Sequence, residues 1–124
     1  PETASRVVLT GAVSDMSKAW LLRHARVLAY PSIYEGFGFP VLEAMSTQTP
    51  VLAARAGSIP EIVGDAAVLV DATDEHAMAD ALERLTHDET VRDDLVRKGS
   101  ERVRAFSWTE SATSMAALYR TVAR

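Results

Sequence analysis

Short apolar runs alternate along the chain with segments in which apolar residues recur at helical spacing. The apolar runs predict strands at residues 7–11, 26–32, 50–54 and 66–71. The helical spacing falls at residues 15–25, from residue 40 to about 45, and at 58–64. Strands that alternate with helices are typical of a parallel sheet with right-handed crossovers. The nearly continuous apolar character of the strands indicates burial on both faces.

The C-terminal part of the sequence predicts helices only. Residues 74–86 carry one apolar stripe, and residues 88–106 carry another that Gly99 interrupts. Ser107 then begins a last helix, with Glu110 placed three residues later as a capping-box partner. The stripe of this last helix consists of Trp108, Ala112, Met115, Ala116, Tyr119 and Val122. We predict an α/β fold, a Rossmann-like parallel sheet flanked by helices, with a helical C-terminal tail.

Composition narrows the class of protein. The chain has 124 residues, 48% of them apolar, which suits one domain spanning residues 1–124. A net charge of −4 argues against a general nucleic-acid binder. There is no cysteine, no apolar run near the ~20 residues that cross a bilayer, and no signal peptide, so we expect a cytoplasmic protein. Because the sequence begins without Met, we interpret it as part of a longer chain.

A glycine turn between two glutamates is the main candidate for chemistry. It lies in 31–39, one of three loops (with 11–14 and 55–59) expected at the carboxyl ends of the strands, where such sheets bind ligands. Gly36 and Gly38 allow close approach of the backbone, and Pro40 suits the first helical position. The helix start offers N–H groups to an anion, while Glu35 and Glu43 can accept hydrogen bonds from hydroxyls. A nucleotide-sugar presents that arrangement of groups.

Other interpretations of the turn stay open at this point. A glycine-rich loop followed by a helix with Glu in its first turn also occurs for structural reasons alone, since the helix dipole stabilises that Glu. The dinucleotide motif GxGxxG is not completed, because position 41 is Val. The chain also has no GK[ST] sequence, so a P-loop is excluded.

Three stretches of the chain resemble one family: EGFGFPVLEAM, then TPVLAARAGSIPEIVGDAAVLVD, and FSWTESA near the end. Together they are similar to the C-terminal donor-binding domain of retaining GT-B glycosyltransferases of the family 4 type. The core of the resemblance is the E-x7-E element, here Glu35 to Glu43. The resemblance covers nearly the whole chain and implies sugar transfer from a nucleotide-diphosphate sugar to an acceptor.

The resemblance also implies roles for particular residues. Glu35 would be catalytic and Glu43 would bind the ribose hydroxyls, while Val13 and Met16 would lie near the nucleobase. The donor sugar and diphosphate would contact Gly36, Phe37, Gly38, Phe39 and Pro40. No metal and no cofactor are expected, and the donor would be a UDP- or GDP-sugar. For the loop Gly57, Ser58, Pro60 and Glu61 we expect a structural role, and for Arg55 a solvated position.

The family places an Arg and a Lys upstream of residues 7–11, and its acceptor site belongs to an N-terminal domain. Both are absent here, so this chain alone is expected to be inactive, with the N-terminal GT-B domain as its partner. Any association with a membrane surface would come through that domain. Nucleic acid is not an expected partner.

Two further hypotheses remain, a non-catalytic module that binds a nucleotide or sugar phosphate, and a flavodoxin-like regulatory or structural domain. We expect the three histidines, His24, His76 and His87, to lie at helix surfaces or ends, and Trp20 and Trp108 to pack in the core.

If the last helix crosses back to the N-terminal domain, as is common in GT-B enzymes, part of its apolar stripe would be exposed in this chain.

Overall fold

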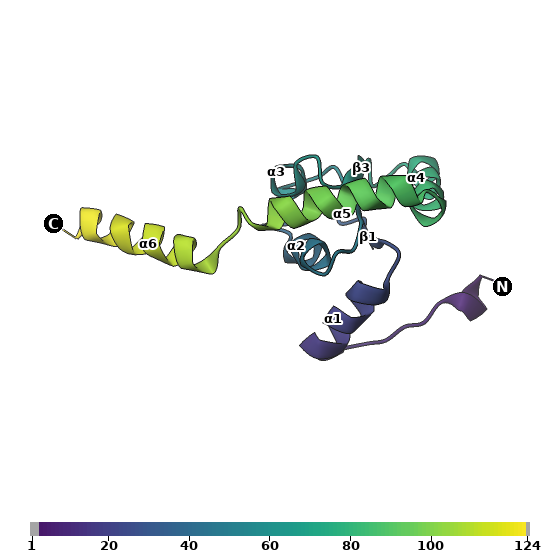
Figure 1. The fold of residues 1–124 in the computed structure, drawn as a ribbon, viewed down its shortest axis with the longest axis horizontal. Helices are drawn as coiled ribbons and strands as arrows, with labels where there is room; N and C mark the ends of the chain where they lie inside the picture. The colour runs from purple at the N-terminus through teal and green to yellow at the C-terminus, as the bar shows by residue number, and fades with distance from the viewer. Residues whose placement is uncertain (1–2, 124) are drawn as a thin grey trace.

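A computed structural model describes residues 3–123. The terminal residues of the domain predicted for 1–124 lie outside this described part. Figure 1 shows a body of strands and helices from which one helix projects. In chain order the elements are η1 (Ala4–Arg6), α1 (Asp15–His24), β1 (Leu28–Tyr30), α2 (Phe39–Ser46), β2 (Val51–Ala54), α3 (Ile59–Val63), β3 (Val68–Val70), α4 (Glu75–His87), α5 (Glu89–Val103) and α6 (Trp108–Val122).

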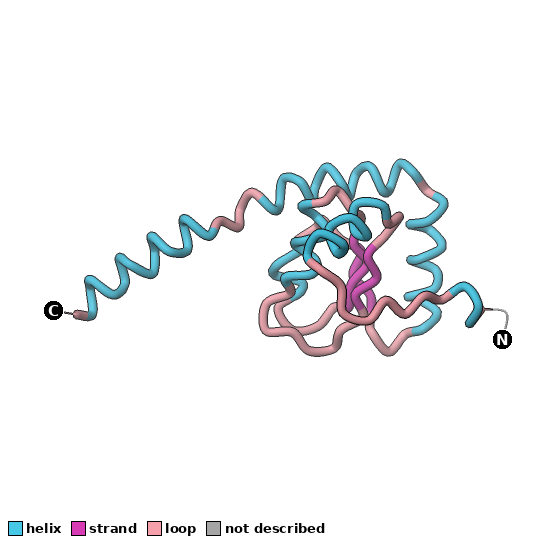
Figure 2. Tube along the Cα trace, turned by 90° about the horizontal axis from the view of Figure 1, so that it is seen from below, coloured by secondary structure: helices cyan, strands magenta, loops and turns pink. Residues whose placement is uncertain are grey.

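The sheet is parallel, with the order β1-β2-β3. Figure 2 shows its strands in magenta, with helices around them. Ala29 pairs with Leu52, and Ala53 pairs with Leu69. All four residues of the central strand β2 are buried, whereas the residues of β1 and β3 are mostly half-buried. The predicted parallel α/β layer is therefore confirmed, with burial on both faces complete only for the central strand.

The strand predicted at residues 7–11 is wrong for this structure. Residues 7–13 are exposed and form neither strand nor helix, with Val8 82% and Leu9 92% accessible. A strand exists only where its N–H and C=O groups pair with a neighbour, and within residues 3–123 no strand lies beside this segment. The β-branched sequence therefore does not by itself give these residues a place in the sheet.

Two apolar clusters hold the helices on the sheet. One is built around α2, α3 and β2 and includes Val41, Met45 and Ile59. The other joins Leu52 of β2 to Leu85 of α4 and Leu95 of α5. The stripe predicted for residues 74–86 faces this second cluster, since Met78, Ala81 and Leu82 pack against it.

The sequence suggested that Gly99 interrupts its helix, and this prediction is wrong. α5 is continuous from Glu89 to Val103, and Gly99 is buried where this helix crosses α2. A Cβ atom at Gly99 would lie 3.1 Å from Cγ of Met45. The missing side chain therefore allows the two helices to pack closely, which a single sequence does not distinguish from a helix break.

The last helix, α6, extends away from the body (Figures 1 and 2). Ser107 caps it as expected, since its Oγ accepts a hydrogen bond from the Glu110 N–H at 3.3 Å. No described residue of α6 is buried, and Trp108 is 79% exposed. Trp20 of α1 is 60% exposed, with its ring stacked on His24 at 4.3 Å. The predicted core positions of both tryptophans are therefore wrong, whereas the expected exposure of the α6 stripe is confirmed.

Candidate functional site

The glycine turn joins the carboxyl end of β1 to the start of α2. Gly38 is the N-cap of α2 with φ of 105°, a conformation that side chains other than glycine rarely adopt. A Cβ atom at this position would also lie 2.6 Å from Cδ1 of Ile59. The buried Gly38 thus allows α3 to pack against the turn, while Phe37 and Phe39 on either side remain exposed.

The turn presents a row of backbone donors. Within residues 3–123, the N–H groups of Gly36, Phe37, Gly38 and Phe39 donate no hydrogen bond to the protein, and the N-cap has no side-chain acceptor. Pro40 follows as the second helical residue rather than the first, because the helix begins at Phe39. Free N–H groups at a helix start, together with the positive end of the helix dipole, favour an anionic or hydroxyl-bearing ligand.

Glu35 is held at one end of this row by two side-chain donors. Its Oε1 accepts hydrogen bonds from the Tyr30 hydroxyl and from Ser32 Oγ, the latter at 2.9 Å. These bonds, first that from Tyr30 and then that from Ser32, lower the pKa of Glu35. Burial, with a further contribution from Glu35, raises the pKa of Tyr30 to about 12. Glu35 is therefore a carboxylate beside a neutral phenol at neutral pH.

A second loop supports the backbone of the turn. Ser58 Oγ donates to the carbonyl oxygens of Glu35, at 3.2 Å, and Phe37, at 2.8 Å. Gly57, with φ of 54°, lies against the Glu35 backbone, so that a Cβ would come within 2.9 Å of its carbonyl oxygen. The loops after β1 and β2 therefore meet as expected, and Gly57 and Ser58 have the structural role predicted for them. Arg55 is exposed.

Glu43 lies on α2, and its partner comes from α1. The Nζ atom of Lys18 is 2.9 Å from Glu43 Oε1, and the pKa of Lys18 is raised, chiefly by this hydrogen bond. The interpretation of Glu43 as a first-turn residue is wrong, since the helix starts at Phe39 and its first turn contains no acidic residue. The helix dipole therefore does not account for Glu43, whose side chain is instead bound by Lys18.

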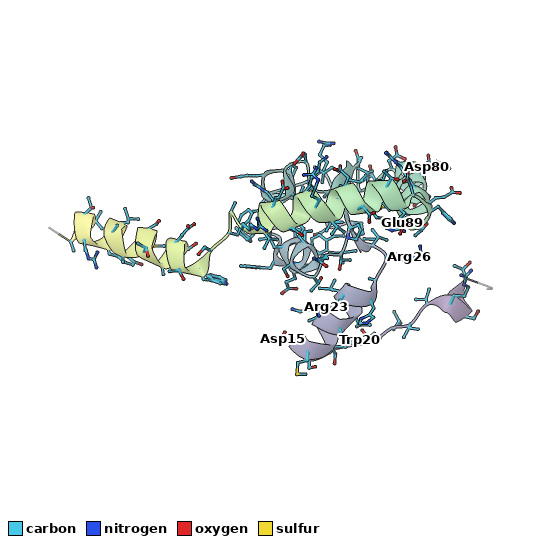
Figure 3. All side chains as sticks on the ribbon, in the orientation of Figure 1. Asp15, Trp20, Arg23, Arg26, Asp80 and Glu89 are labelled. Carbon is cyan, nitrogen blue, oxygen red and sulfur yellow. The ribbon has the colours of Figure 1, made fainter. Side chains whose placement is uncertain are left out.

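Of the two residues predicted near the nucleobase, Val13 lies just before α1 and Met16 lies in its first turn. Val13 is 42% exposed and Met16 is 85% exposed. The structure brings their helix, on which Figure 3 labels Asp15 and Trp20, to Glu43 through Lys18. A hollow of about 310 Å³ lies between α1 and α2, lined by Asp15, Lys18, Ala19, Leu22, Glu43, Ser46 and Thr47. Among residues 3–123, no hydrogen bond joins Val13 or Met16 to the glycine turn.

Aromatic side chains cover the other side of the turn. The Phe37 and Phe39 rings are 4.8 Å apart, and Phe39 stacks on Trp108 at 5.9 Å. Phe106 meets Phe37 edge-on at 6.0 Å, and the guanidinium of Arg102 lies over the Phe106 ring. The turn is therefore in contact with the junction between α5 and α6.

Sequence reasoning missed two features of this site. Tyr30 is the last residue of β1, and its place at the carboxyl end of a parallel strand was an available signal. Lys18 gave no such signal, because only the packing of α1 beside α2 brings it to Glu43. Of the histidines, His24 and His87 lie in the last turns of α1 and α4, and all three are exposed.

Among the described residues, no group of three or more His, Asp or Glu side chains is arranged to hold a metal ion. No helix in the same part of the chain has both the length and the apolar character needed to cross a membrane.

Known glycosyltransferases resemble this chain over most of its length. The chain is 36% identical over 110 residues to the O-antigen chain mannosyltransferase B of Escherichia coli, covering 89% of this chain and 29% of that protein. It is 40% identical over 99 residues to the D-inositol 3-phosphate glycosyltransferase of Corynebacterium glutamicum (strain R), covering 78% of this chain and 24% of the relative. The chain therefore spans less than a third of the length of these relatives.

A solved structure supports the fold. The sucrose-phosphate synthase from Thermosynechococcus elongatus superposes with a TM-score of 0.89 at 34% identity, over 98% of this chain and 31% of that one. Residues 2–102 match the family described as "Glycosyl transferases group 1". The chain belongs to the group 1 glycosyltransferase family, with the Rossmann-like fold of the C-terminal domain of a GT-B enzyme.

Proposed function

We propose that this chain binds the nucleotide-diphosphate sugar of a retaining glycosyltransferase. The observation that carries the proposal is the row of unpaired N–H groups at residues 36–39, with Glu35 before it and Glu43 after it. Each carboxylate uses Oε1 for a protein donor. Among the hydrogen bonds made within residues 3–123, none reaches Oε2 of either residue. One oxygen at each end is thus available to ligand hydroxyls.

The proposed arrangement of the donor follows from these positions. Glu43 takes the ribose hydroxyls, and the base lies toward Val13 and Met16. The backbone of Gly36, Phe37, Gly38, Phe39 and Pro40 approaches the diphosphate and the sugar. Glu35 accepts from hydroxyls of the transferred sugar and stabilises positive charge developing at its anomeric carbon. The acceptor attacks on the face from which the diphosphate leaves, and a donor phosphate oxygen takes its proton.

The complete protein is proposed to catalyse this transfer together with an N-terminal GT-B domain that binds the acceptor. The relatives support this, since the chain spans only 29% and 24% of two named glycosyltransferases. Because one of them is named for mannose, GDP-mannose is the first donor to test, followed by UDP-sugars. No metal or cofactor is part of the proposal. A cytoplasmic location, which the absence of cysteine suits, is part of it.

Calorimetry of the complete protein with GDP, UDP and ADP tests the binding step. We expect one of these nucleotides to bind, and Glu43→Ala to weaken its binding at least tenfold, because two charge-assisted hydrogen bonds are lost. Glu83→Ala is the matched control, since Glu83 is exposed on α4, away from the turn. Equal affinities for Glu43→Ala and Glu83→Ala would contradict a nucleotide site at this turn.

A turnover assay separates the enzyme from a non-catalytic binding module. With GDP-mannose or UDP-glucose as donor, we expect a product whose anomeric configuration, read by NMR, matches that of the donor. Glu35→Ala should abolish transfer while binding of GDP or UDP persists. Binding without turnover in a full screen of donors and acceptors would favour the module, and inverted product would contradict retention.

A further inference from the structure

We infer that Tyr30 and Ser32 are positioning residues that hold the Glu35 carboxylate in the orientation that sugar transfer requires. This inference rests on the proposed function and assigns a role to two side chains beyond the E-x7-E element. Neither of them would contact the donor; both would act through Glu35.

The two donors lie at the carboxyl end of β1 and just after it. Tyr30 is paired in the sheet with Ala53, a buried residue of the central strand. Ser32 follows after Pro31, whose ring restricts the backbone between the two donors. Both hydroxyls are directed to the same atom, Oε1 of Glu35. The sheet therefore determines where this oxygen lies.

The main chain of Glu35 is held independently of its side chain. Ser58 donates to the Glu35 carbonyl oxygen, and Gly57 packs against the backbone of the same residue. With the main chain and Oε1 both fixed, rotation of the side chain is restricted at its two ends. Oε2 is then the oxygen left to meet the transferred sugar, in a direction that the protein decides in advance.

Such preorganisation matters for a carboxylate that stabilises developing charge. Electrostatic stabilisation requires the charge to be in place before the reaction, and errors of about 1 Å reduce rates by ~100-fold. Two hydrogen bonds to the ionised form also keep Glu35 charged, in agreement with its lowered pKa. A hydroxyl donor is suited to this task, because Tyr30 stays neutral and does not compete for the sugar.

The test uses the complete protein with GDP-mannose or UDP-glucose, whichever supports turnover. Tyr30→Phe and Ser32→Ala each remove one hydroxyl and little else. We expect kcat to fall about threefold to tenfold in each and at least tenfold in the double variant. Affinity for GDP or UDP without sugar should stay within twofold, since these ligands do not reach Glu35. Tyr34→Phe is the matched control, because Tyr34 is 85% exposed and its hydroxyl makes no hydrogen bond within residues 3–123.

A double-mutant cycle distinguishes positioning from general support of the fold. In a Glu35→Gln background, Tyr30→Phe should change kcat by less than twofold, because its target has already been altered. Ser32→Thr, which keeps the hydroxyl, should restore most of the turnover lost in Ser32→Ala. The inference is overturned if the double variant keeps its kcat, if the losses persist undiminished in the Glu35→Gln background, or if GDP and UDP affinity falls in parallel.

An NMR titration of Tyr30 needs no turnover, so it tests the contact with Glu35 even if the proposed function is wrong. Tyr30, observed by NMR with labelled tyrosine and assigned through Tyr30→Phe, should ionise with a pKa of about 12 in the complete protein. Burial is the larger cause of this raised pKa, so Glu35→Ala, which removes the acceptor and its charge, should lower it only part of the way toward 10.0, the ordinary value for tyrosine. A Tyr30 titration that does not move in Glu35→Ala would overturn the positioning contact, whatever the assays of transfer show. If the titration shifts but no donor binds or reacts, the proposed function is wrong and the contact is a structural one.

Discussion

Gly57 and Glu35, from the loops after two neighbouring strands, approach so closely that a side chain at position 57 does not fit. A Cβ atom there would be 2.9 Å from the Glu35 carbonyl oxygen and 3.2 Å from its nitrogen. The φ of Gly57, 54°, adds strain for any other residue. We expect Gly57→Ala to lower the free energy of unfolding by about 2 kcal/mol or more, measured by urea denaturation.

Gly36→Ala is the control for this prediction. Gly36 belongs to the same turn, but a Cβ at this position would have no neighbour within 4 Å and its φ is not in the left-handed region. We expect its stability to change by less than about 1 kcal/mol, or to increase slightly because the unfolded chain becomes less flexible. Similar losses in both variants would show that the turn does not depend on the contact between Gly57 and Glu35.

The stability of the fold should depend on pH through Glu35. Since its pKa in the folded state lies below the usual 4.5, its contribution is complete above pH 4.5. That contribution is lost as the pH falls through the lower folded-state value. The stability advantage of the wild type over Glu35→Gln should therefore shrink between neutral and acid pH, as measured by urea denaturation at a series of pH values. An advantage that stays constant or grows on acidification would contradict the hydrogen bonds from Tyr30 and Ser32.

Core packing predicts a large difference between two leucines. Leu85 of α4 is fully buried against Leu52 and Leu95, whereas Leu118 of α6 is 56% exposed. Leu85→Ala should lower the free energy of unfolding by about 2–5 kcal/mol, because it loses burial and leaves a cavity. Leu118→Ala should change it by less than about 1 kcal/mol. Thermal and urea denaturation of both variants would show whether this ranking holds.

The exposed stripe of α6 should cause the isolated chain of residues 1–124 to self-associate. Five apolar side chains of this helix are at least half exposed: Trp108, Met115, Leu118, Tyr119 and Val122. Exposed apolar patches of this kind promote association in water. We expect sedimentation to show concentration-dependent oligomers that Leu118→Glu reduces. A clean monomer at high protein concentration would contradict the prediction.

Much of the architecture follows from patterns local in the sequence. Helical spacing predicted α1, α4 and α6, and the cap expected at Ser107 is present. Short apolar runs predicted the three parallel strands. The E-x7-E element located the turn between Glu35 and Glu43, because glycines at a strand-to-helix junction allow a backbone conformation that few other residues adopt. These features depend on neighbours in the chain, so the sequence by itself determined them.

Other features depend on which surfaces meet, and only the tertiary structure decided them. Residues 7–11 have the composition of a strand but no partner, because pairing is a property of two segments. From the sequence, Gly99 suggests a helix break, but in the fold Met45 packs against it. The partners of the two glutamates, Lys18 for Glu43 and Tyr30 for Glu35, come from separate elements. Hydrogen bonds and ion pairs act over a few ångströms in space, and spacing along the chain does not reveal which side chains the fold brings that close.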